Sequence, residues 1–161
     1  MEKYLRGSLV TQLNVADDFY EAYIRCFSSD KNNHIVSIPA FVNGFFACEL
    51  YLKSLLKKEN KIHNLKNLYD LLDENIKKEI QSVKLDENIK KEIKSIKLDE
   101  KYCFEKLLEI VGDGFAKWRY FFEDDNDFGN ESPFYLSENF LNIYLKVFRE
   151  IAHKNNDSTK K

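Results

Sequence analysis

Two basic residues near the carboxyl end of the chain, Arg149 and His153, have the types and the spacing for phosphate chemistry. They stand four residues apart in a predicted helix, which puts both side chains on one helical face. A histidine there could move a proton in RNA cleavage while the arginine holds the phosphodiester. The alternative is a solvated basic helix end, with Lys154 beyond it, that complements the helix dipole.

A second candidate group surrounds Arg119, which lies between Trp118 and Tyr120 near the end of another predicted helix. An arginine flanked by aromatic rings suits bidentate phosphate binding while a base stacks beside it. If the chain cleaves RNA there, Glu123 or Asp124 is the acidic partner. The alternative is an ordinary ion pair between Arg119 and Glu123, four residues apart.

A third group joins Glu49, Lys53 and His63. Glu49 and Lys53 lie on one face of the most apolar predicted helix, in the order that favours an ion pair. His63 opens the next predicted helix. The three are candidate binding residues, and the alternative for His63 is a helix cap or a packed polar contact.

The cysteines and histidines predict no metal site. Cys26, Cys48 and Cys103 are odd in number and widely spaced, with no CxxC pair and no Cys/His pair at metal-ligand spacing. We expect them to be reduced thiols, with Cys26 and Cys48 in the core. The sequence also has no phosphate-binding loop, dinucleotide fingerprint, HExxH or GxSxG motif, so no cofactor is predicted.

The composition limits the number of domains and the classes of partner that fit this chain. The 161 residues fit one domain, 1–161, and the hydrophobic fraction of 43% supports a core. With 25 basic and 27 acidic residues the net charge is −2, which excludes a globally basic nucleic-acid binder. The amino-terminal residues lack the apolar run of a signal peptide, and no segment is apolar enough to span a membrane. We therefore expect a cytoplasmic protein without a membrane association.

Only 5 Gly and 2 Pro occur, too few for the turns of a sandwich or barrel. The prediction is an all-α, up-and-down helical bundle of about four or five long helices plus short ones. The 3.6-residue apolar period places helices at 9–27, 37–58, 62–72, 99–122 and 137–155, with a disordered tail at 156–161. Segment 37–58 is the expected central helix. Gly44 within it indicates close approach of a neighbouring helix, and Gly112 and Gly114 indicate a kink or close contact near Asp113.

Residues 72–97 contain an internal duplication. LDENIKKEIQSVK at 72–84 is followed by LDENIKKEIKSIK at 85–97. One continuous helix would turn the second apolar stripe away from the first, so the repeat is interpreted as two short helices broken near Lys84. Asp73 and Asp86 suit the N-cap positions. The segment is either a tolerated surface insertion or a partner-binding arm.

Three segments, in order, resemble the HEPN family (higher eukaryotes and prokaryotes nucleotide-binding domains). They are AFVNGFFACELYLKSLL, IHNLKNLYDLL and FAKWRYFFED, and the resemblance covers roughly 20–154. Glu49 and Lys53 match a Glu-x-x-x-Lys step, and His63 matches a His-x-Leu-x-x-Leu helix start. Arg119 matches an arginine near the end of the third long helix, which is similar to a WRY-type branch.

The resemblance implies a helical bundle that forms a homodimer. Many members are toxins or phage-defence nucleases that cut RNA through an Arg-x4-6-His motif. Here no histidine follows Arg119 at that spacing, and Arg149 and His153 have only three residues between them. The leading expectation is thus a prokaryotic defence, toxin–antitoxin or stress protein that binds nucleotide, RNA or a protein partner without this RNase activity. The alternatives are a divergent metal-independent RNase and a structural dimer.

Overall fold

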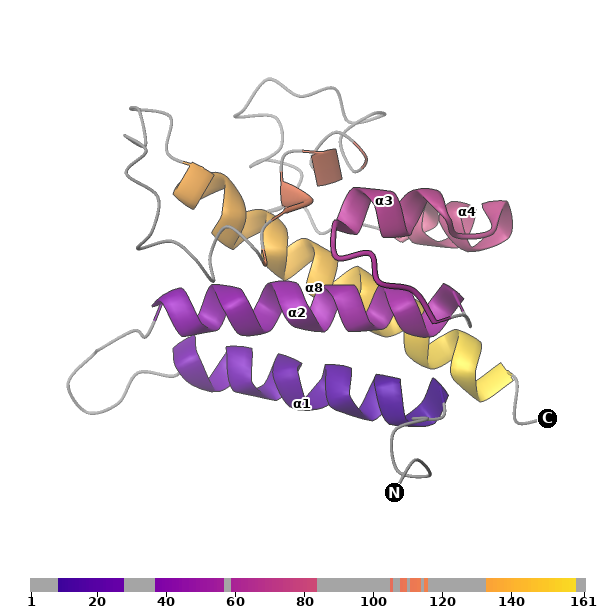
Figure 1. The fold of residues 1–161 in the computed structure, drawn as a ribbon, viewed down its shortest axis with the longest axis horizontal. Coiled ribbons are helices and arrows are strands. Elements are labelled where there is room, and N and C mark those ends of the chain that lie inside the picture. Colours follow the sequence, from indigo (N-terminus) through magenta and orange to yellow (C-terminus); the bar gives the residue numbers. More distant parts are fainter. Residues whose placement is uncertain are drawn as a thin grey trace.

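Five helices make up the described part of the computed structural model, and no strand occurs in it (Figure 1). The structure describes residues 9–27, 37–56, 59–83, 105, 108–109, 111–113, 115 and 133–158. The helices are α1 (Leu9–Phe27), α2 (Ser37–Leu56), α3 (Leu65–Asp70), α4 (Glu74–Ser82) and α8 (Pro133–Ser158). The predicted all-α bundle is confirmed.

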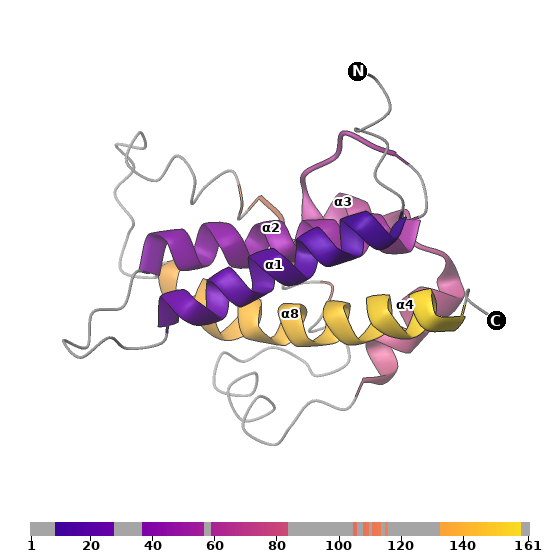
Figure 2. The same ribbon diagram turned by 90° about the horizontal axis from the view of Figure 1, so that it is seen from below.

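Helix α2 is the centre of the bundle, as its apolar composition predicts. It packs against α1, α8 and α3. The colours in Figures 1 and 2 show that α1 runs opposite to α2, whereas α8 runs in the same direction as α2. Most α2 side chains on the inner faces are fully enclosed, among them Phe41, Phe45, Tyr51 and Leu52. Burial on several sides explains why the helix lacks a polar stripe.

Gly44 lies where α2 meets both neighbours. A Cβ atom at this position would stand 2.7 Å from Leu141 Cδ2 of α8 and 2.9 Å from Tyr23 Cδ2 of α1. Both separations are shorter than van der Waals contact between carbon atoms. The prediction that Gly44 marks a close helix approach is confirmed.

The apolar faces predicted for α1 and α8 are largely the buried ones. Leu13, Ala16 and Tyr23 of α1 are buried, and so are Tyr144 and Phe148 of α8. Ile24, which the 3.6-residue apolar period also assigns to the α1 face, is 42% exposed. Ile24 lies at the edge of the buried apolar stripe of α1, and this stripe is narrower than the sequence predicts.

Helix α8 is longer than predicted at both ends. It begins at Pro133, four residues before the predicted start at 137, and proline is well tolerated in the first turn of a helix. It continues to Ser158, so residues 156–158 of the expected disordered tail are helical. Just before these residues, Lys154 Nζ and Asn155 Nδ2 both donate hydrogen bonds to Glu79 of α4.

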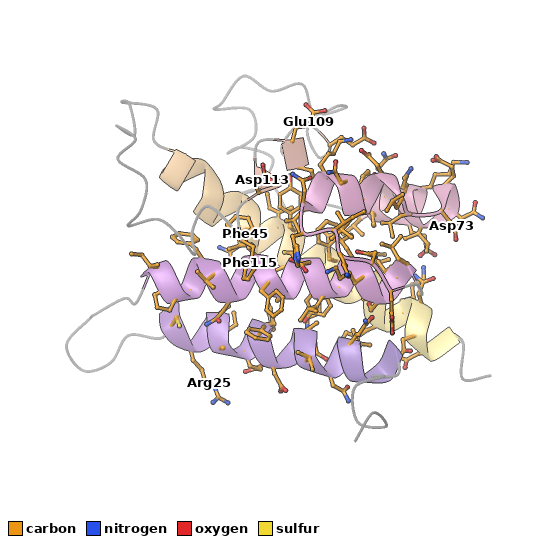
Figure 3. The ribbon with its side chains drawn as sticks, in the orientation of Figure 1. Arg25, Phe45, Asp73, Glu109, Asp113 and Phe115 are labelled. Atoms are coloured by element: carbon orange, nitrogen blue, oxygen red, sulfur yellow. The ribbon has the colours of Figure 1, made fainter. Side chains whose placement is uncertain are left out.

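Helix α3 starts three residues later than predicted. Asn64 is its N-cap, and its side chain accepts a hydrogen bond from the Asn67 amide. Gly112 lies directly against Asn64, and the Leu65 amide donates to the Gly112 carbonyl at 2.9 Å. Figure 3 shows Asp113 at the start of α3, where it accepts from Asn64 Nδ2. The close contact predicted near Asp113 is confirmed, and a Cβ at 112 would clash with the capping side chain.

The first unit of the duplication forms α4. Its N-cap is Asp73, as predicted, although the side chain makes no capping hydrogen bond, and Val83 after it is extended. The second unit, 85–97, lies outside the described residues. So does most of the predicted helix 99–122, whose described backbone is helical at 105, 108–109, 111 and 115 and turns at 112–113.

Candidate functional site

The bundle brings one carboxylate, Asp17 of α1, into contact with three donors from two other helices. Tyr51 Oη of α2 donates to Asp17 Oδ1 at 2.8 Å. From α8, Arg149 Nε lies 3.0 Å from Oδ1, and His153 Nε2 lies 2.9 Å from Oδ2. We call these four residues the Asp17 cluster. It unites the predicted pair Arg149 and His153 with two residues that the sequence did not single out.

Local sequence explains how each helix presents its member. Asp17 follows Ala16, which is fully buried, so it stands at the rim of the buried α1 face. Arg149 and His153 flank one edge of the α8 face whose centre is Phe148 and Ala152. A four-residue step in a helix returns side chains to one face, and both therefore reach the same carboxylate.

The cluster is open to solvent on one side. The side chains of Arg149, His153 and Asp17 are 44%, 38% and 26% exposed, whereas Tyr51 is fully buried beneath them. The Arg149 guanidinium also lies over the Tyr20 ring, 5.0 Å from its centroid. This stacking is a cation–π contact, and it leaves most of the guanidinium donors for other partners.

The electrostatics of the cluster keep Asp17 ionised. Burial raises the pKa of Asp17, but the hydrogen bonds from His153, Tyr51 and Arg149 outweigh burial, so the pKa lies below its ordinary value. Burial and the neighbouring Asp17 carboxylate raise the pKa of Tyr51. For Arg149, partial burial lowers the pKa, but the hydrogen bond and the charge of Asp17 prevail and raise it. Within the cluster, Asp17 therefore keeps its negative charge and Arg149 keeps its positive charge.

The contact with Asp17 also fixes the tautomer that the neutral His153 ring adopts. A carboxylate only accepts, so Nε2 carries the proton, and Nδ1 of the neutral ring keeps its lone pair. In this tautomer Nδ1 can accept a proton, and His153 lies on the same helical face as Arg149.

The predicted Glu49–Lys53 pair forms, with 2.7 Å between Lys53 Nζ and Glu49 Oε1. His63 Nδ1 reaches the same oxygen at 3.0 Å. His63 precedes the Asn64 cap, so it is a polar contact and not the helix cap. These three residues form a second group, separate from the Asp17 cluster.

The remaining predicted site residues lie outside the described residues. They are Trp118, Arg119, Tyr120 and Asp124, and Cys103 lies outside them as well. Of the other cysteines, Cys48 is buried and Cys26 is half-buried. Burial raises the pKa of the Cys48 thiol, which matches the expected inert core cysteine.

Sequence reasoning missed Asp17, Tyr51 and Tyr20. The only available signal was an acidic residue beside the predicted buried face of α1, and such a position is also common for solvated carboxylates. The partners that give Asp17 its role are 34, 132 and 136 residues away along the chain, beyond any local pattern.

Comparison of the chain with protein-family models, with curated proteins and with solved structures finds no match. Within the described ranges, no three His, Cys, Asp or Glu side chains gather closely enough to hold a metal ion. None of the helices described here is long and apolar enough to cross a membrane.

Proposed function

We propose that the chain binds RNA at the Asp17 cluster and cleaves its phosphodiester bonds without a metal ion. The observation that carries this proposal is the shared contact of Arg149 and His153 with the carboxylate of Asp17 on a solvent-open face. This arrangement supplies a proton acceptor, a phosphate-binding cation and a carboxylate that orients both.

The step we propose is an internal transesterification. His153 Nδ1 takes the proton of a ribose 2′ hydroxyl, and the 2′ oxygen forms a bond to phosphorus. The bond from phosphorus to the 5′ oxygen breaks, and that oxygen recovers a proton from the imidazolium. Arg149 stabilises the charge that gathers on the phosphoryl oxygens, and Asp17 stabilises the imidazolium. The products are a 2′,3′-cyclic phosphate and a 5′ hydroxyl.

The resemblance to the HEPN family supports the same reaction class. It also adds the homodimer and the defence or toxin–antitoxin context to the proposal. The spacing of Arg149 and His153 differs from the family motif by one residue, but both still reach one carboxylate because they stand one helical turn apart.

A second candidate function is binding of RNA or nucleotide without cleavage. The observation that favours it is that Asp17 already binds both Arg149 and His153. The same contacts can serve as a structural ion-pair network that holds α8 against α1. In this case the aromatic-flanked Arg119 is the expected phosphate anchor, with Trp118 and Tyr120 as stacking partners.

A degradation assay on total RNA in the presence of EDTA tests cleavage. We expect wild-type protein to produce fragments with 2′,3′-cyclic phosphate ends. His153→Ala and Arg149→Ala should each lower the rate by about 100-fold or more. Lys154→Ala is the matched control, because it removes a neighbouring positive charge of α8 that pairs with Glu79 instead.

Absence of cleavage by wild-type protein at high concentration contradicts the ribonuclease proposal. Salt-sensitive RNA binding that persists without cleavage, and that Arg119→Ala abolishes, supports the second candidate. Sedimentation equilibrium of the same preparation checks the proposed homodimer.

A further inference from the structure

Glu49 is an unusual carboxylate for the interior of a protein. Its side chain is 1% exposed, yet both of its hydrogen bonds fall on Oε1. The other oxygen, Oε2, is buried and has no hydrogen-bond partner in the described part of the chain. Leaving such an atom unpaired is costly, and proteins tend to keep such atoms where the charge has a use.

The group that faces this carboxylate from outside is His63. Its side chain is 64% exposed, and it lies in the connection 59–64, which is neither helix nor strand. Because Nδ1 donates to Glu49, the neutral ring keeps its lone pair on Nε2. A carboxylate that accepts from one ring nitrogen fixes the tautomer and the orientation of the ring, so Nε2 is the nitrogen that is left to react.

Lys53 completes the group. It is 12% exposed and binds the same Glu49 oxygen as His63, so its ammonium group is a close neighbour of the imidazole. A fixed positive charge in this position attracts an anionic reactant to the ring and offsets the charge of a phosphoryl group bound there.

We propose that His63 is a nucleophilic imidazole and a site of phosphoryl transfer, with an acyl phosphate or a phosphoramidate as the class of donor. Nε2 forms a bond to phosphorus, and the bond from phosphorus to the carboxylate or amine of the donor breaks. The leaving group takes the electron pair of that bond. The ring becomes a cation that retains its Nδ1 proton, and Glu49 stabilises it through the existing hydrogen bond. The site does not depend on RNA cleavage at the Asp17 cluster.

Potassium phosphoramidate is the probe for this site, with phosphohistidine mapped by mass spectrometry under alkaline conditions. We expect rapid phosphorylation of His63 in the full chain. His63→Gln should abolish this signal and leave the protein folded, because the side chain at this position is 64% exposed. Glu49→Gln keeps the size of the side chain but removes its charge, and it should slow the reaction about tenfold.

His153 is an internal control because Asp17 holds it through Nε2 and its side chain is less exposed. No phosphohistidine at His63, or reaction no faster than that of a free histidine peptide, overturns the proposal. Equal rates for wild-type protein and a folded Glu49→Gln variant overturn it as well. Because the readout is covalent modification, it is unaffected by whether the protein cleaves RNA.

Discussion

Two acidic residues, Asp17 and Glu49, each hold a histidine, but they do so in different ways. Asp17 is partly open and shares its contacts with Tyr51, Arg149 and His153 over both oxygens. Glu49 is enclosed, and its contacts with the described residues use one oxygen alone. At Asp17 the imidazole is held through Nε2, and at Glu49 through Nδ1. The two histidines therefore present opposite ring nitrogens for chemistry.

The lowered pKa of Asp17 predicts a stability change in acid. Its pKa in the folded state lies below the unfolded value of about 3.9, so ionised Asp17 stabilises the fold above that pH. This contribution is lost as the pH falls through the folded pKa. At pH 7, Asp17→Asn should lower the unfolding free energy by about 1–2 kcal/mol.

Urea denaturation between pH 7 and pH 2 measures this effect. The difference between wild type and Asp17→Asn should shrink below pH 4 and vanish once the wild-type carboxyl is protonated. A difference that stays constant over the whole range contradicts an ionised, stabilising Asp17. Asp18→Asn, on the exposed side of α1, is the matched control.

At the scale of elements, contacts between helices set the ends and the spacing of the bundle. Near the carboxyl end of α8, Lys154 and Asn155 bind Glu79 of α4 and so tie the two helices together. Helix α3 begins at Leu65 because the Asn64 side chain caps it. Gly112 has no side chain, so it leaves room for the Asn64 side chain in the capping position. Outward-facing side chains such as Arg25 on α1 point away from these contacts (Figure 3).

Gly44→Ala tests the close packing of α2. Alanine gains about 1 kcal/mol of helix propensity, but its Cβ meets Leu141 and Tyr23 at distances that force a backbone or side-chain shift. We expect a net loss of about 1–2 kcal/mol in unfolding free energy, measured by denaturant titration. Val15→Ala, at a position that is 37% exposed, should change it by less than about 0.5 kcal/mol. Stabilisation by Gly44→Ala contradicts this packing.

At the scale of the whole molecule, α1, α2 and α8 supply most of the described core. The duplicated region adds Leu72 and Ile80, both from its first unit. The second unit, residues 85–97, lies outside the described residues, so its interpretation as an insertion stays a prediction.

Deletion of residues 85–97 tests that interpretation. It removes one 13-residue unit and leaves the first, together with its junction to the next segment, in the same sequence context. We expect the shortened chain to keep its helical circular dichroism and a cooperative thermal transition. A large loss of helical signal or of cooperativity contradicts a dispensable insertion. If the segment is a partner-binding arm, the shortened chain should still fold but should lose its interaction with the partner.

The sequence alone determined the all-α class, the central position of α2, the bounds of α1 and the close helix packing at Gly44. It also determined the Glu49–Lys53 pair. These features depend on apolar periodicity, on glycine and on the four-residue step of a helix, all of which act over short stretches of chain.

The tertiary structure decided which groups meet. Asp17 and His153 are 136 residues apart, and they touch only because α1 and α8 pack beside the same central helix. Likewise, the partner of His63 depends on how the connection 59–64 folds back onto α2. A local pattern fixes the face on which a side chain lies, but the packing of helices decides what that face meets. This is why the sequence identified Arg149 and His153 and could not identify the carboxylate that joins them.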